Sequence, residues 1–378
     1  MIVERAKKIY LLNAIICNCI YLLLFNLFFV KNIDAITIKD LLNREIKISG
    51  KINNIIALGP GTLRLLAYMD ALQFVKGVES LEKDKSMLFK RPYALINYEY
   101  IKKLPTIGNG GPNMLPDFEA IVSIKSDLIF TASYTLDQIK LIQEKTNIPV
   151  VSLSYGNANA IINKEIEASL NLIGLVLNKS NRAQDLIKYI NSTIMDFQER
   201  VPTNKTINIK TYIAGLGYKG SHGFTGSTPY YPPFDLLNLK NILSSFPEFS
   251  KLNHIILDKE AILLLNPDYI FIDSNGLNII KMDIIRNKAY YRLLKAVKNN
   301  HVYSLLPHNN YTTNIENALI NTYFIGKTIY PDKFSDIDLE KKANEIYQFF
   351  IGKYIFSEMQ QNGIGCKRLF FDPDCIAW

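Results

Sequence analysis

Two stretches of the chain repeat one pattern, EAIVSIKSDLIFTAS at 119–133 and EAILLLNPDYIFIDS at 260–274. Each begins with an amphipathic segment, crosses a short polar break and ends in an apolar run that suits a buried strand. The repetition indicates one helix–strand unit in each half of the chain. The sequence therefore predicts two similar α/β halves.

Strands and helices alternate on both sides of the first repeat. Residues 55–61, IIALGPG, predict a buried strand that ends in a glycine turn, and TLRLLAYMDAL at 62–72 predicts a helix. LDQIKLIQEKTN at 136–147 predicts another helix, and IPVVSLSYG at 148–156 another strand. This alternation favours mainly parallel sheets.

The alternation stops in the middle of the chain. Between residues 160 and 201 apolar residues recur at helical spacing, with a break at 178–180, which predicts two helices without a strand. After Pro202 the alternation resumes, and PPFDLLNLKNILSSF at 232–246 is expected to be a helix. The predicted organisation is an N-terminal lobe at 36–178, a bridging helix at 179–201 and a C-terminal lobe with closing helices at 202–378.

The amino terminus has the pattern of an export segment. Arg5, Lys7 and Lys8 precede an apolar run at 9–30, which is long enough to span a bilayer. Ile33-Asp34-Ala35 is a poor cleavage site, so residues 1–35 are expected to be either a signal peptide or an uncleaved anchor. Both alternatives place the rest of the chain in the periplasm or at the outer face of the cytoplasmic membrane.

The composition narrows the classes of function. The 378 residues are 48% hydrophobic and carry a net charge of +8. Such a chain buries a large core without metals or disulfides, and it lacks the clustered basic face of a nucleic-acid-binding protein. Cys366 and Cys375 lack zinc spacing. They either close a small disulfide loop or stay unpaired.

Sequence motifs of catalysis are missing. The chain has no G-x-S-x-G, C-x-x-C or H-E-x-x-H motif and no dinucleotide-binding fingerprint. The chain has only four histidines, so few residues could act as a general base. We therefore expect a binding protein rather than an enzyme, with no catalytic residues and no resident cofactor or metal.

In a two-lobed binding protein the ligand lies between loops at the carboxyl ends of strands. GYKGSHGFTGSTPYYPPF at 217–234 is such a loop, and it supplies Tyr218, His222, Tyr230 and Tyr231. Phenolates and imidazole suit Fe(III), and aromatic faces suit a planar chelate or a macrocycle. The alternative is that the two adjacent tyrosines only pack the loop onto its lobe.

Four further ligand contacts are predicted in other loops. His308 and Tyr311 lie between a predicted strand and the start of a helix, and Tyr155 ends a strand. Arg91 either holds a carboxylate or a catecholate with two parallel hydrogen bonds, or is a solvated surface residue. The two remaining histidines, His254 and His301, are expected at the surface.

With these segments the chain resembles the metal-chelate and vitamin B12 class of ABC-importer substrate-binding proteins. The matching pieces include IIALGPGTLRLLAYMDA, LPTIGNGG, FEAIVSIKSDLIF, RAQDLIKYIN and NPDYIFIDSNG, and they cover roughly residues 37–335. The subgroup that it most resembles transports iron complexes, and GLGYKGSHGFTGSTPYYPPF and YTTNIENAL add to that match.

The resemblance implies a class III periplasmic binding protein, with two Rossmann-like lobes of mainly parallel sheets bridged by a single long helix. It implies the extracytoplasmic component of an ABC importer that captures an iron(III), siderophore-like complex and delivers it, as a monomer, to the permease and ATPase subunits. Haem, a corrinoid or a nickel or cobalt chelate are alternative ligands. A membrane-anchored ligand sensor is the alternative function.

Members of this class dock onto arginines of the permease through one exposed glutamate on each lobe. Glu119 matches the position in the first lobe. The corresponding position in the second lobe falls at Lys240, which is not an acid. Asp235, Glu248 or an asymmetric contact are the alternatives there.

Overall fold

The computed structural model describes residues 35–111, 114–156, 160–201, 209–371 and 376–377. By their internal contacts the described residues divide into a small unit, which includes 35–38 and 47–51, and a large unit that includes 39–46 and the described residues from 52 onward. The predicted export segment lies outside the described residues except for Ala35. Within the described ranges no helix is both long and apolar enough to cross a membrane.

A short hairpin-like sheet stands at the start of the described chain. Its two strands are β1 (Ile36–Lys39) and β2 (Glu45–Ile48). In the turn between them the Arg44 guanidinium donates to the Asp40 carboxylate, and the backbone N–H of Ser152 donates to the same carboxylate at 3.1 Å. Asp40 thereby attaches this turn to the first large sheet of the large unit.

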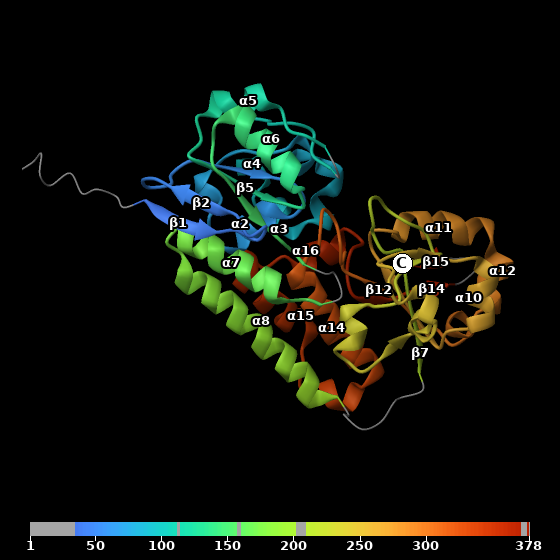
Figure 1. Cartoon of the computed structure of the whole chain (residues 1–378). Coiled ribbons are helices and arrows are strands. Elements are labelled where there is room, and N and C mark those ends of the chain that lie inside the picture. The colour runs from blue at the N-terminus through green and yellow to red at the C-terminus, as the bar shows by residue number, and fades with distance from the viewer. Residues whose placement is uncertain (1–34, 112–113, 157–159, 202–208, 372–375, 378) are drawn as a thin grey trace, which may run out of the picture. The chain divides into compact units, whose positions relative to one another are not determined.

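The N-terminal lobe is built on a parallel sheet of four strands (Figure 1). In spatial order they are β4 (Val75–Gly77), β3 (Ile55–Leu58), β5 (Leu128–Ala132) and β6 (Val150–Leu153). Every residue of the last three is buried, which explains their continuous apolar runs, because helices cover both faces of a parallel sheet.

Short helices surround this sheet. The α-helices are α2 (Thr62–Tyr68), α3 (Pro92–Ile96), α4 (Tyr98–Ile101), α5 (Phe118–Ile124), α6 (Leu136–Thr146) and α7 (Lys164–Val176). Three 3₁₀ segments are η1 (Leu72–Phe74), η2 (Ser80–Lys83) and η3 (Lys85–Lys90). Thr135 starts α6 with a capping box to Gln138, and this satisfies backbone N–H groups that the first turn leaves unpaired.

The C-terminal lobe is built on a second sheet with five strands. In spatial order they are β13 (Lys367–Arg368), β12 (Val302–Leu305), β11 (Tyr269–Asp273), β7 (Lys210–Ala214) and β9 (Lys240–Asn241). All neighbours are parallel except β13, which pairs antiparallel at the edge. Two sheets of mainly parallel strands confirm the predicted α/β fold class.

Helices again surround the sheet. They are α9 (Pro232–Asp235), α10 (Lys259–Leu265), α11 (Leu277–Arg286), α12 (Lys288–Leu293), α13 (Lys295–Lys298), α14 (Ile315–Ile329), α15 (Leu339–Ile351) and α16 (Phe356–Gln361). The remaining short elements are β8 (Gly226–Ser227), β10 (Ile255–Ile256), β14 (Phe370–Phe371), β15 (Ile376–Ala377), η4 (Ile242–Ser245), η5 (Pro247–Phe249) and η6 (Pro331–Phe334).

The internal repeat occupies the same place in both lobes. α5 and β5 form it in the first lobe, and α10 and β11 form it in the second. Asp117 and Asp258 precede the two helices, and Ile121 and Ile262 are each fully buried. Glu119 and Glu260 are therefore equivalent positions in the first turns, and both side chains are exposed.

The prediction of one helix over residues 232–246 is wrong. α9 ends after one turn, and Asn238 takes a left-handed conformation with φ of 52°. Lys240 and Asn241 then form β9, which pairs with β7 as the outermost strand of the sheet, and a 3₁₀ turn follows. The backbone groups at the edge of β7 gain partners in this way, which outweighs the local helical pattern.

A single long helix, α8 (Ser180–Arg200), connects the two lobes, and α15 is fastened along it (Figure 1). Near the start of α8, Arg182 donates to the backbone oxygens of Tyr68 at 2.8 Å and Phe349 at 2.7 Å. At its end, Arg200 binds Asp336, just before α15. We call this pair of helices the brace.

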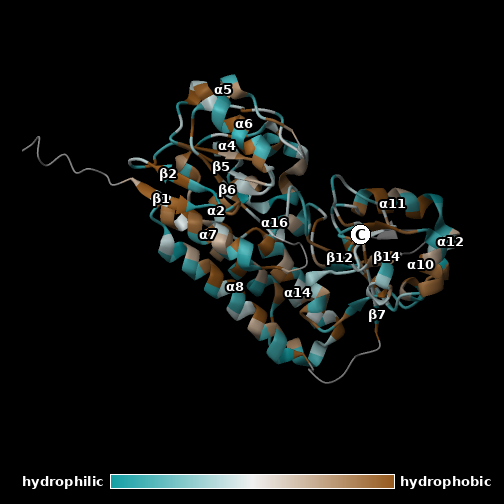
Figure 2. Ribbon diagram, in the orientation of Figure 1, coloured by the Kyte–Doolittle hydropathy of each residue, from teal (hydrophilic) through white to brown (hydrophobic). Residues whose placement is uncertain are grey.

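Each lobe has its own hydrophobic core. In Figure 2 the labelled strands of both sheets are mostly brown, while α8 has both hydrophobic and hydrophilic residues along its length. Ile56, Ile129 and Val150 belong to the core of the first lobe, and Tyr212, Ile270 and Val302 to that of the second. The amphipathic α8 buries Leu186, Ile190 and Phe197.

Candidate ligand-binding site

Loops at the carboxyl ends of strands from both lobes enclose a cavity of about 330 Å³, which we call the main cavity. Pro60 follows β3 of the first lobe, and Leu81 and Met87 lie in η2 and η3. The second lobe contributes the segments Gly217–Ser221, after β7, and Asn309–Thr312, after β12. The cavity therefore lies where the strand order predicts a ligand site.

The two second-lobe segments are tied to each other by side-chain amides. Asn309 donates to the Gly217 carbonyl at 3.1 Å, and Asn275 donates to the Asn309 carbonyl at 3.1 Å. A Cβ atom on Gly217 would lie 2.6 Å from that same Asn309 carbonyl oxygen. Only glycine permits this approach, so the glycine-rich loop has a structural reason at this position.

The main cavity favours a negatively charged occupant. Lys219 lines it, and Lys90 reaches Ser221 Oγ from the first lobe at 3.4 Å. No acidic side chain is among the described residues that line this cavity. Burial lowers the pKa of Lys90, and the nearby charge of Asp273 acts against this shift.

A second, inner cavity of about 110 Å³ shares Gly217, Tyr218 and Asn309 with the main cavity. His254 lines it, stacks on the Tyr218 ring at 5.2 Å and lies 4.2 Å from the His222 ring. The expectation of a surface His254 is therefore wrong, since it is half-buried in this cluster. Burial lowers the pKa of His254 to about 4, so its ring is neutral near pH 7.

Tyr230, Tyr231 and His308 also line the inner cavity. Tyr231 is 1% exposed, and its ring meets those of Phe234 at 4.9 Å and His308 at 5.1 Å. Tyr231 thus packs the loop onto its lobe, which was one of the two alternatives for the adjacent tyrosines. It also borders the inner cavity. Burial lowers the pKa of His308 to about 4.

Three of the predicted contact residues line neither cavity. Arg91 is fully buried rather than solvated, and its guanidinium pairs with Glu82 at 3.0 Å and donates to the Leu81 carbonyl at 2.8 Å. The hydroxyl of Tyr155 donates to the Gly61 carbonyl at 3.0 Å. His222 contacts the Tyr218 carbonyl through Nε2 at 2.7 Å. These contacts support the walls of the cavities.

Tyr311 lines the main cavity, and the residues that hold it were not predicted. Its hydroxyl donates to Glu79 Oε2 at 2.5 Å, and Arg64 donates to its carbonyl at 3.1 Å. The sequence carried one signal for Arg64, which stands among leucines in a predicted helix. The structure shows that every residue of this helix, α2, is buried. Glu79 carries no such signal in its local pattern.

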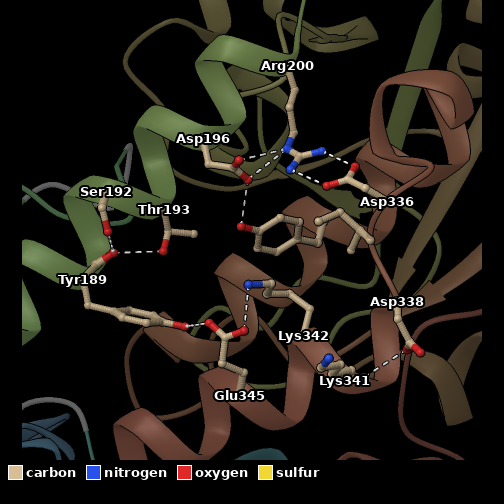
Figure 3. Close-up of a pocket in the computed structure, with 12 residues that line it drawn as sticks. Tyr189, Ser192, Thr193, Asp196, Arg200, Asp336, Asp338, Lys341, Lys342 and Glu345 are labelled. Carbon is tan, nitrogen blue, oxygen red and sulfur yellow. Dashed lines mark hydrogen bonds and ion pairs between the residues drawn. The ribbon is translucent and has the colours of Figure 1, made fainter.

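Another hollow of the large unit lies beside the brace, with a volume of about 650 Å³. Figure 3 shows its charged side chains turned toward one another. Arg200 forms two hydrogen bonds with Asp336, at 2.6 and 2.9 Å, and also binds Asp196. Glu345 bonds both Tyr189 and Lys342. Because these groups already pair with one another, they stabilise the brace and leave little for a ligand.

The described residues do not form a site for a metal ion without its own ligands. Within the described ranges no group of three or more His, Cys, Asp or Glu side chains is arranged to hold a metal ion. Cys366 is buried, with Sγ 3.6 Å from Asn321 Oδ1. Cys375 lies outside the described residues, as do Cys17 and Cys19, so the suggested disulfide stays a prediction.

Residues 62–308 match the sequence model of a family described as periplasmic binding protein. The chain belongs to this periplasmic binding protein family. Among its relatives, the molybdate-binding protein MolA of Haemophilus influenzae is 26% identical over 83% of this chain and 90% of its own. An uncharacterised ABC transporter substrate-binding lipoprotein of Bacillus subtilis, YvrC, is 22% identical over 80% of this chain and 87% of its own.

Solved structures agree on the fold of this periplasmic binding protein. The structure of MolA from Haemophilus influenzae bound to molybdate superposes with a TM-score of 0.66 at 19% identity, covering 84% of this chain and 98% of MolA. These relatives are substrate-binding proteins of ABC transporters and not enzymes, which confirms the expectation of a binding protein. Such proteins work with a membrane permease and an ATPase.

Proposed function

We propose that this chain is the extracytoplasmic substrate-binding component of an ABC importer and that its main cavity captures a compact, negatively charged iron(III) chelate. The observation that carries the proposal is the lining of that cavity. Lys219, the nearby Lys90 and several amide and hydroxyl groups surround it, and no acidic residue is among its described lining residues. Such a lining favours an anion.

The size of the cavity supports a compact ligand. About 330 Å³ lies at the lower end of the range for small-molecule sites, which favours a small chelate over haem or a corrinoid. Tyr218 and Tyr311 add aromatic surface to one side of a chelate. Because the described residues offer no cluster of metal ligands, the metal would arrive with its own ligands already bound.

A molybdate-like oxyanion is the second candidate. The name of the relative MolA supports it, as does the positive charge of the main cavity. An oxyanion accepts hydrogen bonds, and Asn310, Ser221 and the backbone N–H groups of the glycine loop are donors. A tetrahedral oxyanion would leave much of the main cavity to water, which is why we place it second.

For the permease contact we propose Glu119 together with Glu260. The internal repeat places both side chains in the first turn of equivalent helices, one in each lobe, and both are exposed. This pair provides the second-lobe acid that Lys240 does not. Charge reversal at either position, Glu119→Lys or Glu260→Lys, should reduce import in cells while ligand binding by the purified protein stays unchanged.

Titration of the purified chain decides the ligand. Ferric citrate and sodium molybdate are the anionic probes, and a nickel–histidine complex and cobalamin are the comparison ligands. We expect an anionic probe to bind most tightly, and Lys219→Gln to weaken that binding several-fold. Lys251→Gln, an exposed lysine that lines neither cavity, is the matched control. Tighter binding of cobalamin or of the nickel complex than of both anions would contradict the proposal.

A further inference from the structure

The segment Asn310–Thr312 of the second lobe is held in an uncommon backbone conformation against the first lobe. Tyr311 and Thr312 have φ of 54° and 79°. A β-branched residue such as Thr312 rarely adopts a positive φ, so surrounding contacts must hold it there. The Thr312 methyl group fits against Gly61 of the first lobe, where an added Cβ would lie 2.2 Å from it.

Arg64 is the first of these contacts. It is fully buried on α2 and donates from Nη2 to the Asn310 carbonyl at 2.7 Å and from Nη1 to the Tyr311 carbonyl at 3.1 Å. The guanidinium also lies 4.8 Å above the Tyr93 ring. Hydrogen bonds from a charged donor are stronger than neutral ones, and the planar fork suits two neighbouring carbonyls.

The hydroxyl of Tyr311 is the second contact. It donates to Glu79 Oε2 at 2.5 Å and accepts from the backbone N–H of Gly111 at 3.1 Å. The same Glu79 oxygen accepts from the N–H of Gly59 at 3.1 Å. One phenol thus joins two loops of the first lobe to the segment from the second.

The brace limits how the main cavity can open. α8 is fastened along α15 by Arg182 near one end and Arg200 at the other. Wide separation of the lobes would break these charge-assisted hydrogen bonds and bend α8. A local change at the strained segment needs neither, and Asn310, Tyr311 and Thr312 all line the main cavity.

We propose that Asn310–Thr312 is a latch between the lobes, with Arg64 as its positioning residue, and that ligand enters and leaves the main cavity when the latch releases Arg64, Glu79 and Gly111. The role in ligand passage rests on the proposed function. The opening of the latch, in which the segment loses its contacts with Arg64, Glu79 and Gly111, does not rest on the proposed function. This opening can be measured without any ligand.

Hydrogen exchange tests the latch in the full-length protein. Tyr311→Phe removes the hydroxyl bonds to Glu79 and Gly111 and keeps the ring. We expect several-fold faster amide exchange in the peptides that contain Gly111 and residues 308–314. Tyr100→Phe, which removes a hydroxyl bond to the Val75 carbonyl elsewhere in the first lobe, is the matched control and should leave both peptides unchanged. Unchanged exchange in Tyr311→Phe would overturn the latch.

Stopped-flow kinetics with ferric citrate and with molybdate test its role in passage. If the segment is a latch, Tyr311→Phe should raise both the association rate and the dissociation rate of the ligand several-fold, because it weakens the contacts that keep the latch closed. A simple ligand contact would raise the dissociation rate only, and that result in Tyr311→Phe would overturn the gating role. Arg64→Lys keeps the charge but not the fork, so its rates should fall between those of wild type and Arg64→Met. If exchange rises but neither probe binds, the latch stands and the proposed ligand fails.

Discussion

Four charged side chains of the first lobe are buried, although charged residues usually lie at the surface. Arg64 and Arg91 are fully buried, and Glu79 and Glu82 are each 2% exposed. Each group has at least one hydrogen-bond partner, as buried charges require. Close approach of the backbone at Gly59 and Gly61 makes this arrangement possible, because both glycines have positive φ and close neighbours.

Gly61→Ala should destabilise the protein by about 2–4 kcal/mol. The added methyl group would lie 2.2 Å from Thr312 Cγ2 and 2.4 Å from Tyr155 Cε2, at a φ of +82° that L-residues avoid. Gly352→Ala is the control, since Gly352 has φ of +75° but nothing within 4 Å. It should lose only about 1–2 kcal/mol. Chemical denaturation measures both, and equal losses would contradict the predicted clash.

Glu79 should make stability depend on pH. Burial, and to a lesser degree the charge of Glu82, raises the pKa of Glu79 to about 7 from 4.5, although the Tyr311 hydroxyl acts against this. The folded state therefore binds a proton more tightly than the unfolded state, so stability increases as the pH falls from about 7 toward 4.5. Relative to Glu79→Gln, the wild type should gain about 3 kcal/mol between pH 8 and pH 4.5. Parallel pH curves for the two proteins would rule this out.

At the scale of elements, the second helix of the brace, α15, stiffens the connection between the lobes that α8 makes. The Tyr189 ring stacks on Phe349 at 4.0 Å, and its hydroxyl bonds Glu345, so the middle of α8 also contacts α15. α15 in turn contacts α2 and α3 of the first lobe. The closing helices of the proposed 202–378 lobe thus pack on both lobes and stiffen the connection between them.

Arg200→Ala should lower the free energy of unfolding by about 1–2 kcal/mol, because it removes charge-assisted hydrogen bonds to Asp196 and Asp336 on two elements. Lys102→Ala removes an exposed ion pair with Glu99 within one helical turn, and it should leave the stability nearly unchanged because solvent screens such a pair. Urea denaturation compares the two variants. A loss in Arg200→Ala no larger than in Lys102→Ala would show that the brace contributes little.

At the scale of the whole molecule, we expect only small closure on ligand binding. Bending α8 breaks its i→i−4 hydrogen bonds, and the brace adds a second helix that must move with it. Small-angle scattering of the protein with and without saturating ferric citrate or molybdate should give the same radius of gyration within error. A clear decrease with the probe that binds would show hinge closure instead.

Much of the fold was predictable from local pattern. The repeat at 119–133 and 260–274 predicted the central helix–strand unit of both lobes, and the break at 178–180 predicted the start of α8. Such features depend on the period of apolar residues and on capping residues, which a sequence displays directly. The glycine-rich loop was also visible, and Tyr218 within it lines both cavities.

The sequence by itself determined the α/β class, the two-fold repetition and which loops follow the carboxyl ends of strands. Only the tertiary structure decided the partners of single residues, such as Arg64 with Asn310, which are 246 positions apart. It also turned 240–241 into a strand, since the edge of β7 needed hydrogen-bond partners. The reason is physical: periodicity reports which face of an element is buried, whereas a partner depends on how distant elements pack together.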